Sequence, residues 1–157
     1  SHDSENFYYS RIPFDNNIYF YVMIPDFKLS TEKARAVLPK EYKVSDLISN
    51  ASKLGLLIDS FHRKNYDDLR FLLDDKVHQP YRFSLINNSE DIFNYSEKHG
   101  ALGEYISGAG PTLISLNYKD AGFFSAMKKE LENLPDKWSL EMKKICTRGA
   151  ETEDIRE

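Results

Sequence analysis

The run NIYFYVMIP at residues 17–25 constrains the fold more than any other stretch of the chain. Its residues are aromatic, aliphatic or β-branched from Ile18 to the closing Pro25. Such a run is typical of a β-strand, and because it is continuous rather than alternating, we expect both of its faces to be covered. A sheet needs a second layer against which to bury its apolar face. The run therefore predicts a layered domain built on a sheet.

Two helices are predicted directly after this strand. Residues 26–39 contain a loop and then a short helix, which Ser30 or Thr31 can cap. Further on, apolar residues recur at steps of three and four, which predicts one apolar face of a long helix over about 45–63. These residues are Val44, Leu47, Ile48, Ala51, Leu54, Ile58 and Phe61. Ser45 is the expected cap of that helix.

The rest of the chain alternates between predicted helices and predicted strands. Further helices are expected over 66–75, within 82–100 and over 121–134. Strands are expected up to about Ser107, then through Leu116 after a glycine turn, and over 137–150. Strands and helices thus mix along one chain without repeats or low-complexity linkers. This order predicts an α+β two-layer sandwich with a mainly antiparallel sheet.

Composition excludes several classes of protein. The 157 residues suit one domain, and 41% of them are hydrophobic, which is enough to fill a core. No apolar stretch approaches the roughly 20 residues of a membrane span, and no apolar leader is visible. A net charge of −4 without a basic run argues against nucleic-acid binding. The single cysteine, Cys146, excludes an intrachain disulfide and fits a reducing, cytoplasmic location.

Metal and thiol chemistry find little support in the sequence. The four histidines, His2, His62, His78 and His99, lie far apart and lack metal-ligand spacing, so we expect no metal site. Cys146 has no recognisable catalytic surroundings. The chemistry must therefore come from other residue types.

LSTEKAR, at residues 29–35, is the first of three stretches that carry more polar chemistry than packing requires. Thr31 and Arg35 are four residues apart, so a helix places them on one face. A hydroxyl and a guanidinium beside a helix N-terminus suit a carboxylate or a phosphate. A capped surface helix with a solvated arginine is the alternative.

The other two stretches are DDKVHQPYR at 74–82 and SGAGPT at 107–112. In the first, polar side chains crowd around Pro80, which we expect to break helix geometry just before Arg82. Such side chains form either a site or contacts that merely satisfy a loop. The second stretch is not a dinucleotide-binding motif, because the segment after it is a predicted strand. It is either a plain turn or a backbone cradle for a ligand.

In this order and at these separations, the three stretches resemble the C-terminal half of homoserine kinases, within the GHMP kinase superfamily. The resemblance runs from about Tyr19 to Glu132. SGAGPT is similar to the third superfamily motif, and the other two stretches narrow the resemblance to homoserine kinases. It implies a ferredoxin-like domain over 17–150 with helices on one face of the sheet. Residues 1–16 would then be a remnant of the domain junction, and 151–157 a charged tail.

The resemblance also implies a reaction and a set of site residues. A homoserine kinase transfers the γ-phosphoryl group of ATP, with Mg²⁺, to the hydroxyl of L-homoserine in threonine biosynthesis. By resemblance, the substrate would be bound by Thr31, Arg35, Arg82 and Gly108, and the nucleotide by Ser107 and Gly110. The two arginines would clamp the substrate carboxylate. No catalytic residue is expected in this half, and His78 is expected to orient the loop that presents Arg82.

The sequence departs from the superfamily in one large respect. It contains no phosphate loop of the form P-x-x-x-G-L-G-S-S-A. We therefore expect a fragment, inactive alone, whose ATP and Mg²⁺ contacts lie mainly in a missing N-terminal half. A mevalonate-type or sugar kinase of the same superfamily and a non-catalytic α+β module that binds an amino acid are the alternatives. A phosphate loop encoded upstream in the reading frame would support the kinase over the binding module. The sequence leaves open whether the chain forms a homodimer.

Overall fold

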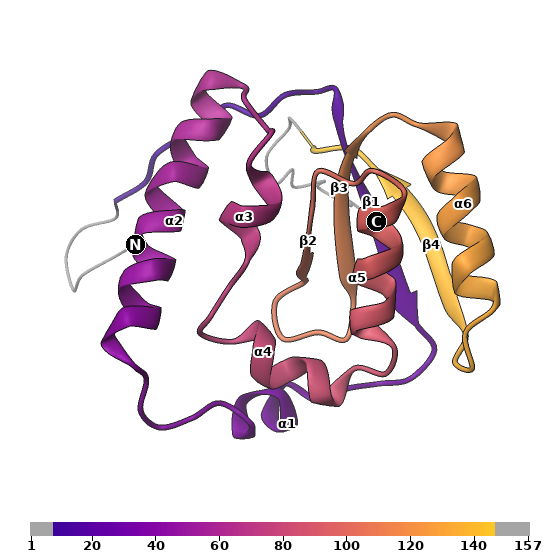
Figure 1. The fold of residues 1–157 in the computed structure, drawn as a ribbon, viewed down its shortest axis with the longest axis horizontal. Coiled ribbons are helices and arrows are strands. Elements are labelled where there is room, and N and C mark those ends of the chain that lie inside the picture. Colours follow the sequence, from indigo (N-terminus) through magenta and orange to yellow (C-terminus); the bar gives the residue numbers. More distant parts are fainter. Residues whose placement is uncertain (1–7, 147–157) are drawn as a thin grey trace, which may run out of the picture.

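The computed structural model describes residues 8–146 of the chain. Figure 1 shows how its helices and strands are arranged. In chain order they are β1 (Ile18–Pro25), α1 (Thr31–Ala36), α2 (Val44–Arg63), α3 (Leu69–Leu73), α4 (Gln79–Arg82), the 3-10 helix η1 (Phe83–Leu85), α5 (Ser89–Lys98), β2 (Gly103–Ile106), β3 (Leu113–Tyr118), α6 (Ala121–Glu132) and β4 (Trp138–Lys143).

The four strands form one antiparallel sheet in the order β2-β3-β1-β4. β1 lies in its interior, where Tyr21 stands opposite Ser115 of β3 on one side and Met142 of β4 on the other. The predicted strand over 17–25 is thus the strand that ties the sheet together. This arrangement confirms the predicted α+β two-layer sandwich with an antiparallel sheet, and its strand order is the ferredoxin-like one.

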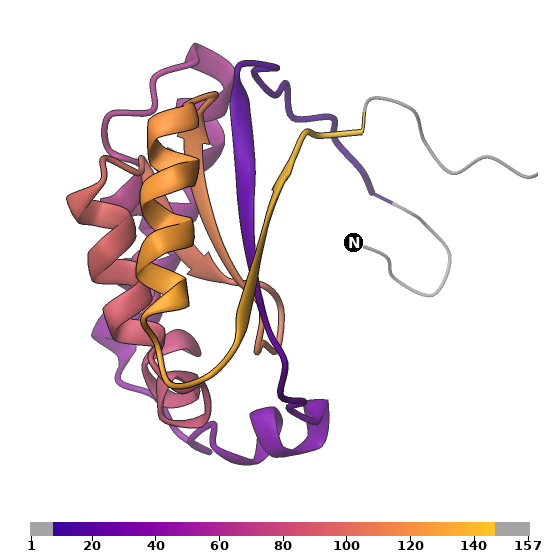
Figure 2. The same cartoon turned by 90° about the vertical axis from the view of Figure 1, so that its right-hand side faces the viewer.

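Helices α5 and α6 cover one face of this sheet (Figure 2). Alternate residues of β1 point toward them, because side chains of a strand alternate between its two faces. Tyr21 and Met23 are completely buried, and the Tyr21 ring meets the Phe123 ring edge-on at 4.6 Å. Ile92 of α5 and Met127 of α6 complete this main core.

Local sequence signals explain where several helices begin and end. Ser30 caps α1, since its Oγ accepts a hydrogen bond from the Lys33 amide at 3.1 Å. Asp120 caps α6 in the same way through the amides of its first turn. The predicted cap at Ser45 is wrong: α2 begins one residue earlier, and Lys43 at its N-cap makes no side-chain capping bond.

The second face of the sheet is only partly covered. Ile18 is buried in a smaller cluster with Tyr66 and Leu69, but Phe20 and Val22 are half-buried and Ile24 is exposed. Among the residues that the structure describes, no helix packs over β1 and β4 on this side (Figure 2). The expectation that both faces of β1 are covered is therefore wrong for most of its length.

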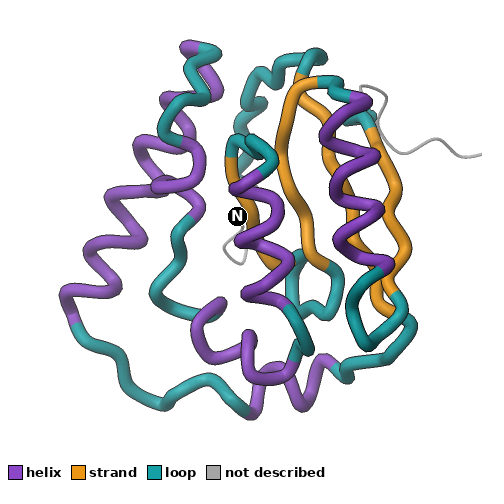
Figure 3. Tube along the Cα trace, turned by 45° about the vertical axis from the view of Figure 1, so that its right-hand side comes forward, coloured by secondary structure: helices purple, strands orange, loops and turns teal. Residues whose placement is uncertain are grey.

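The long helix α2 lies at the β2 edge of the sheet, next to α3 (Figures 1 and 3). Its buried positions are Lys53 and Ser60, whereas most of the apolar residues that predicted the helix are exposed. The periodicity correctly predicted a helix over about 45–63. Most of this apolar face, however, does not turn toward the body of the domain; the exception is Phe61, which packs against the smaller cluster around Tyr66.

The remaining predicted elements agree with the structure to within a few residues. Helix α3 occupies the middle of 66–75, α5 the second half of 82–100, and α6 most of 121–134. β4 covers the first part of the strand predicted over 137–150, whose last residues lie outside the part of the chain that the structure describes. The charged tail at 151–157 lies outside it as well.

Candidate functional site

A network around Asp75 fixes the start of the short helix α4. Asp75 Oδ2 accepts hydrogen bonds from the backbone amides of His78 and Gln79, both at 2.6 Å. Asn50 of α2 donates to the other carboxylate oxygen and accepts from the Lys76 amide at 2.9 Å. These bonds satisfy amides at the start of the helix, which have no partner within it. Asp75 therefore sets the direction in which α4 projects.

Pro80 opens α4 rather than breaking it. The proline stands in the first turn, where its missing N–H costs nothing because that position has no helical acceptor. The expectation that Pro80 interrupts a helix just before Arg82 is therefore wrong. The turn that Pro80 begins carries Arg82 at its end.

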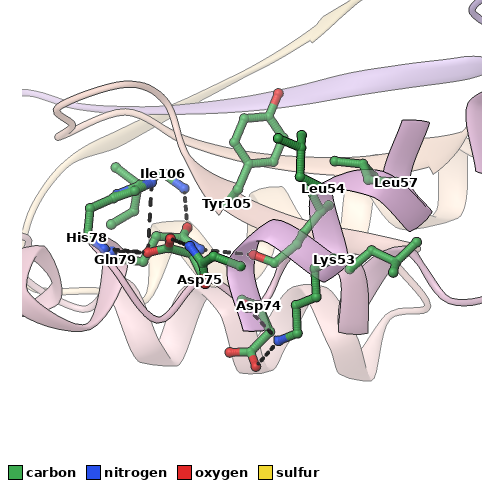
Figure 4. A pocket seen from close by; sticks show the side chains of 12 residues that line it. Lys53, Leu54, Leu57, Asp74, Asp75, His78, Gln79, Tyr105 and Ile106 are labelled. Carbon is green, nitrogen blue, oxygen red and sulfur yellow. Dashed lines mark hydrogen bonds and ion pairs between the residues drawn. The ribbon is translucent and has the colours of Figure 1, made fainter. Parts of the chain in front are cut away.

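Gln79 ties this short helix to the sheet. Its Nε2 donates to the Leu73 carbonyl at 3.1 Å, and its Oε1 accepts from the Ile106 amide at 2.7 Å. Figure 4 shows Gln79 between Asp75 and Ile106 at the wall of a cavity. Ile106 is the last residue of β2, so Gln79 holds the point at which the glycine-rich loop leaves the sheet.

Arg82 joins the three stretches that sequence analysis singled out. Its Nη1 donates to the Gly108 carbonyl at 2.7 Å, and its Nε donates to the Ala34 carbonyl at 3.2 Å. The same Nη1 lies 3.2 Å from Nδ1 of His78. One guanidinium thus connects α1, α4 and the glycine-rich loop. Nη2 makes no hydrogen bond to residues 8–146.

The glycine-rich loop is a tight turn whose backbone conformation requires glycine at two positions. Gly108 has φ +56° and Gly110 has φ +85°, both in the left-handed region that side chains disfavour. The Ser107 amide donates to the Thr112 carbonyl and the Gly110 amide to the Ser107 carbonyl, both at 2.9 Å. A Cβ on Gly108 would meet nothing within 4 Å, so this side of the loop is open.

Thr31 and Arg35 lie on α1, both exposed. Neither side chain makes a hydrogen bond or ion pair with residues 8–146. Arg63 and Arg70, by contrast, are paired with carboxylates. The structure therefore brings Arg82 and Gly108 into direct contact. It also places α1 beside them, because Arg82 donates to the carbonyl of Ala34, the residue before Arg35.

Electrostatics favour a neutral His78 and an ionised Asp75. Burial lowers the pKa of His78, and the neighbouring Arg82 charge lowers it further, against the opposing effect of Asp75. Burial raises the pKa of Asp75. Hydrogen bonds from the amides of Gln79 and His78 and from the Asn50 side chain have a larger opposite effect, so the pKa of Asp75 is lowered overall. A neutral His78 can accept the Arg82 hydrogen bond at Nδ1. The structural role expected for His78 stays a prediction that these contacts support.

A cavity of about 290 Å³ adjoins α4 (Figure 4). Its apolar wall is formed by Leu54, Leu57, Tyr105 and Ile106, and Asp75 and His78 stand at its polar side.

Within residues 8–146, no group of three or more histidines, cysteines or carboxylates is arranged to hold a metal ion. No helix in that part of the chain is long and apolar enough to cross a bilayer.

Sequence reasoning missed two residues that build this site. Asn50 gave no signal, because its partner Asp75 lies 25 positions away, in the loop between α3 and α4. Asp75 did carry a signal: an aspartate a few residues before the first turn of a helix is a typical capping pattern. The stretch DDKVHQPYR was expected to be a helix break, and this pattern was therefore not used.

Comparisons with known proteins agree with the fold. The profile of the family described as GHMP kinases C terminal matches residues 57–133. A homoserine kinase of Clostridium acetobutylicum is 45% identical over 139 residues, which are 88% of this chain and 47% of that protein. A homoserine kinase of Clostridium novyi is 39% identical over 150 residues, 95% of this chain and 50% of that protein. This chain therefore spans about half the length of the curated relatives that it matches.

Solved structures show the same architecture. Homoserine kinase from Cytophaga hutchinsonii superposes with a TM-score of 0.80 at 24% identity, over 87% of this chain and 44% of that one. Mevalonate kinase of L. major superposes with a TM-score of 0.56 at 17% identity, over 78% of this chain and 40% of that one. At these identities the likeness concerns the fold alone. Together with the curated relatives, it identifies the chain as a homologue of the homoserine kinases over about half of their length, with the fold of a GHMP kinase C-terminal domain.

Proposed function

We propose that this chain is the substrate-binding half of a homoserine kinase, which transfers the γ-phosphoryl group of ATP to the hydroxyl of L-homoserine. The observation that carries the proposal is the convergence of the three motif stretches on the Arg82 guanidinium, 3.2 Å from Ala34 O and 2.7 Å from Gly108 O. The homology to homoserine kinases supplies the substrate class.

The chain's own residues suit the amino-acid end of homoserine. Arg82 has a free Nη2, and Arg35 has no carboxylate partner among residues 8–146, so both guanidinium groups can take the substrate carboxylate. Thr31, on the same helix as Arg35, offers a hydroxyl. Gly108 leaves one side of the loop open, which allows a ligand to approach its backbone. In this proposal the domain binds and orients, and positioning is a large part of phosphoryl-transfer catalysis.

The residues of this chain do not suit the polyphosphate and its metal ion. The sequence has no phosphate loop, and the described residues 8–146 contain no cluster of carboxylates that could hold Mg²⁺. Ser107 and Gly110 are proposed as backbone contacts to the nucleotide, with the remaining ATP contacts in the other half of the longer protein. The chain alone is therefore expected to be catalytically silent.

Steady-state kinetics of arginine variants in the full-length kinase test this proposal. Arg35→Ala and Arg82→Lys should each raise the KM for homoserine or lower kcat/KM roughly ten- to hundredfold, since each loses a charge-assisted contact of about 1.5–3 kcal/mol. Arg63→Ala is the matched control, because Arg63 lies far along α2 and pairs with Asp59. The KM for ATP should hardly change. Equal losses for ATP and homoserine would show that the arginines lie at the other end of the site.

A further inference from the structure

We infer that Asn50 of α2 is a positioning residue for substrate binding, because it fixes, through Asp75, the turn that presents Arg82. The inference deepens the proposed function and rests on it, since Arg82 is proposed to clamp the homoserine carboxylate. Asn50 and Arg82 are joined indirectly, through the Asp75 carboxylate and the first turn of α4. A change on α2 would thus reach the substrate clamp without touching the substrate.

Helix α4 is too short to hold its own conformation. It consists of the four residues Gln79–Arg82, and an isolated helical turn is unstable because its nucleation costs more than its few bonds return. The Arg82 amide donates to the His78 carbonyl at 3.2 Å, a bond that closes this turn but does not anchor it to the domain. Bonds from outside the turn must therefore fix the direction in which Arg82 projects.

Asp75 supplies two of these outside bonds, and Asn50 holds Asp75 in place. One carboxylate oxygen of Asp75 accepts from the amides of His78 and Gln79, each at 2.6 Å (Figure 4). The other oxygen accepts from Asn50 Nδ2. The Asp75 side chain is only 13% exposed, so water offers little replacement for a lost donor. A carboxylate that turned away from Asn50 would release both amides of the turn.

The Asn50 side chain uses both ends of its amide group. Its Nδ2 donates to Asp75, and its Oδ1 accepts from the Lys76 amide at 2.9 Å. An aspartate of the same size could accept the second bond but could not donate the first. Two bonds of opposite direction from one planar group hold the 75–76 segment in one orientation against α2.

The anchored turn reaches the guanidinium of Arg82 through His78. The His78 amide is bound by Asp75, and the His78 ring Nδ1 lies 3.2 Å from Arg82 Nη1. A guanidinium and a carboxylate pair well only in the right orientation, and a misplacement of about 1 Å can cost on the order of a hundredfold in rate. A shift of α4 should therefore appear as weaker use of homoserine.

An exchange of the two side chains tests this inference in the chain extended to the full reading frame. Asn50→Asp keeps the shape of the side chain and the acceptor for Lys76, but it places a second carboxylate against Asp75. The double variant Asn50→Asp/Asp75→Asn restores the bond in the reverse direction. The amide at position 75 can donate to the carboxylate at position 50, while its oxygen still accepts from the two α4 amides.

The expected result is a specific loss that the exchange repairs. Asn50→Asp should lower kcat/KM for homoserine roughly tenfold or more, mainly through KM, and hardly change the KM for ATP. The double variant should return to within about threefold of the unmodified protein. Asn50→Ala, a milder change that removes both bonds without adding a charge, should alter the homoserine KM in the same direction.

Ile18→Val is the matched control for lost stability. Ile18 is completely buried, and it lies at the end of β1 that faces away from Ile106 and α4. The loss of one methylene should lower the Tm without moving α4. Both KM values should therefore stay unchanged in this control.

A spectroscopic measurement in the 157-residue chain does not depend on any activity. The Nε–H group of Arg82, which donates to the Ala34 carbonyl at 3.2 Å, gives a nitrogen–proton NMR signal that reports the surroundings of the guanidinium. Arg82→Lys identifies that signal by its disappearance. Asn50→Asp should shift or broaden the signal, the double variant should restore it, and Ile18→Val should leave it in place.

Two results would overturn the inference. An Asn50→Asp protein that melts at a lower temperature but keeps the homoserine KM and the Arg82 signal would assign Asn50 a role in stability alone. A loss in homoserine use that the double variant does not repair, although it restores the Arg82 signal, would show that Asn50 contacts the substrate itself. The proposed function is judged separately: an unmodified full-length protein without activity on homoserine would refute it, and the NMR comparison would still decide whether Asn50 orients Arg82.

Discussion

Gln79 makes the clearest test of how the site is built, because its side chain ties α4 both to the end of β2, where the glycine-rich loop begins, and to the end of α3. Gln79→Ala removes the acceptor of the Ile106 amide and the donor to the Leu73 carbonyl. Ile106 is only 2% exposed, so its N–H would lose its partner with little water to replace it. A buried unsatisfied donor costs about 1–3 kcal/mol.

The full effect of Gln79→Ala on the free energy of unfolding should be about 2–4 kcal/mol. The Gln79 side chain is 5% exposed, so the cost of its lost packing adds to the cost of the unsatisfied Ile106 amide. The Leu73 carbonyl contributes less, because Leu73 is half-buried and water can partly replace the lost bond. For a domain of this size the Tm should fall by roughly 4–16 °C. Differential scanning calorimetry of the purified chain gives this value directly.

Two further variants separate hydrogen bonding from other causes. Gln79→Met keeps most of the volume but neither bond, so it should retain most of the destabilisation. Asn94→Ala, at an exposed position of α5, should change the stability by less than about 0.5 kcal/mol. A Gln79→Met protein as stable as the unmodified chain would refute the reasoning, because packing alone would then explain the role of Gln79.

Two other predictions concern the surroundings of Arg82. The pKa of His78, followed by NMR of its ring, should lie below the ordinary value of about 6.5. The stability contributed by neutral His78 is then present above about pH 6.5 and is lost as the pH falls below it. A pKa at or above 6.5 would contradict the interpretation that a neutral His78 accepts the Arg82 hydrogen bond. Gly110→Ala should destabilise the chain by about 1–3 kcal/mol more than Gly108→Ala, since both have positive φ but only at Gly110 does a Cβ approach Ile86 Cδ1, at 2.8 Å. Thermal melts that rank the two variants in the opposite order would show that the loop conformation differs.

Much of the fold could be predicted because its signals are local. The uninterrupted run at 17–25 predicted β1, and the glycine pair at 108–110 predicted the turn between two strands. Ser30 was rightly named as a possible cap of α1. Each of these signals lies within a few residues of the feature that it predicts.

The orientation of α2 could not be predicted in this way. Periodicity shows which residues share a face, but it does not show what that face contacts. Lys53 is buried because Asp74, on a different element, pairs with it, and no local pattern contains that information. The same limit applied to β1, whose apolar second face suggested a covering layer that residues 8–146 do not provide.

The candidate site depended on distant contacts in the same manner. Arg82 lies 48 positions from Ala34 and 26 from Gly108, so spacing alone could not join them. The resemblance to homoserine kinases grouped the three stretches, and the structure supplies the bonds that connect them. Ligand contacts of all six predicted site residues, Thr31, Arg35, Arg82, Ser107, Gly108 and Gly110, stay predictions.

Substrate preference in the full-length protein tests the central claim most directly. Coupled measurement of ADP release would compare L-homoserine, mevalonate and galactose as phosphoryl acceptors at saturating ATP and Mg²⁺, with the 157-residue chain as a parallel sample. We expect clear preference for homoserine in the full-length protein and no turnover by the short chain. A full-length protein that prefers mevalonate or galactose, or that phosphorylates none of the three, would contradict the assignment.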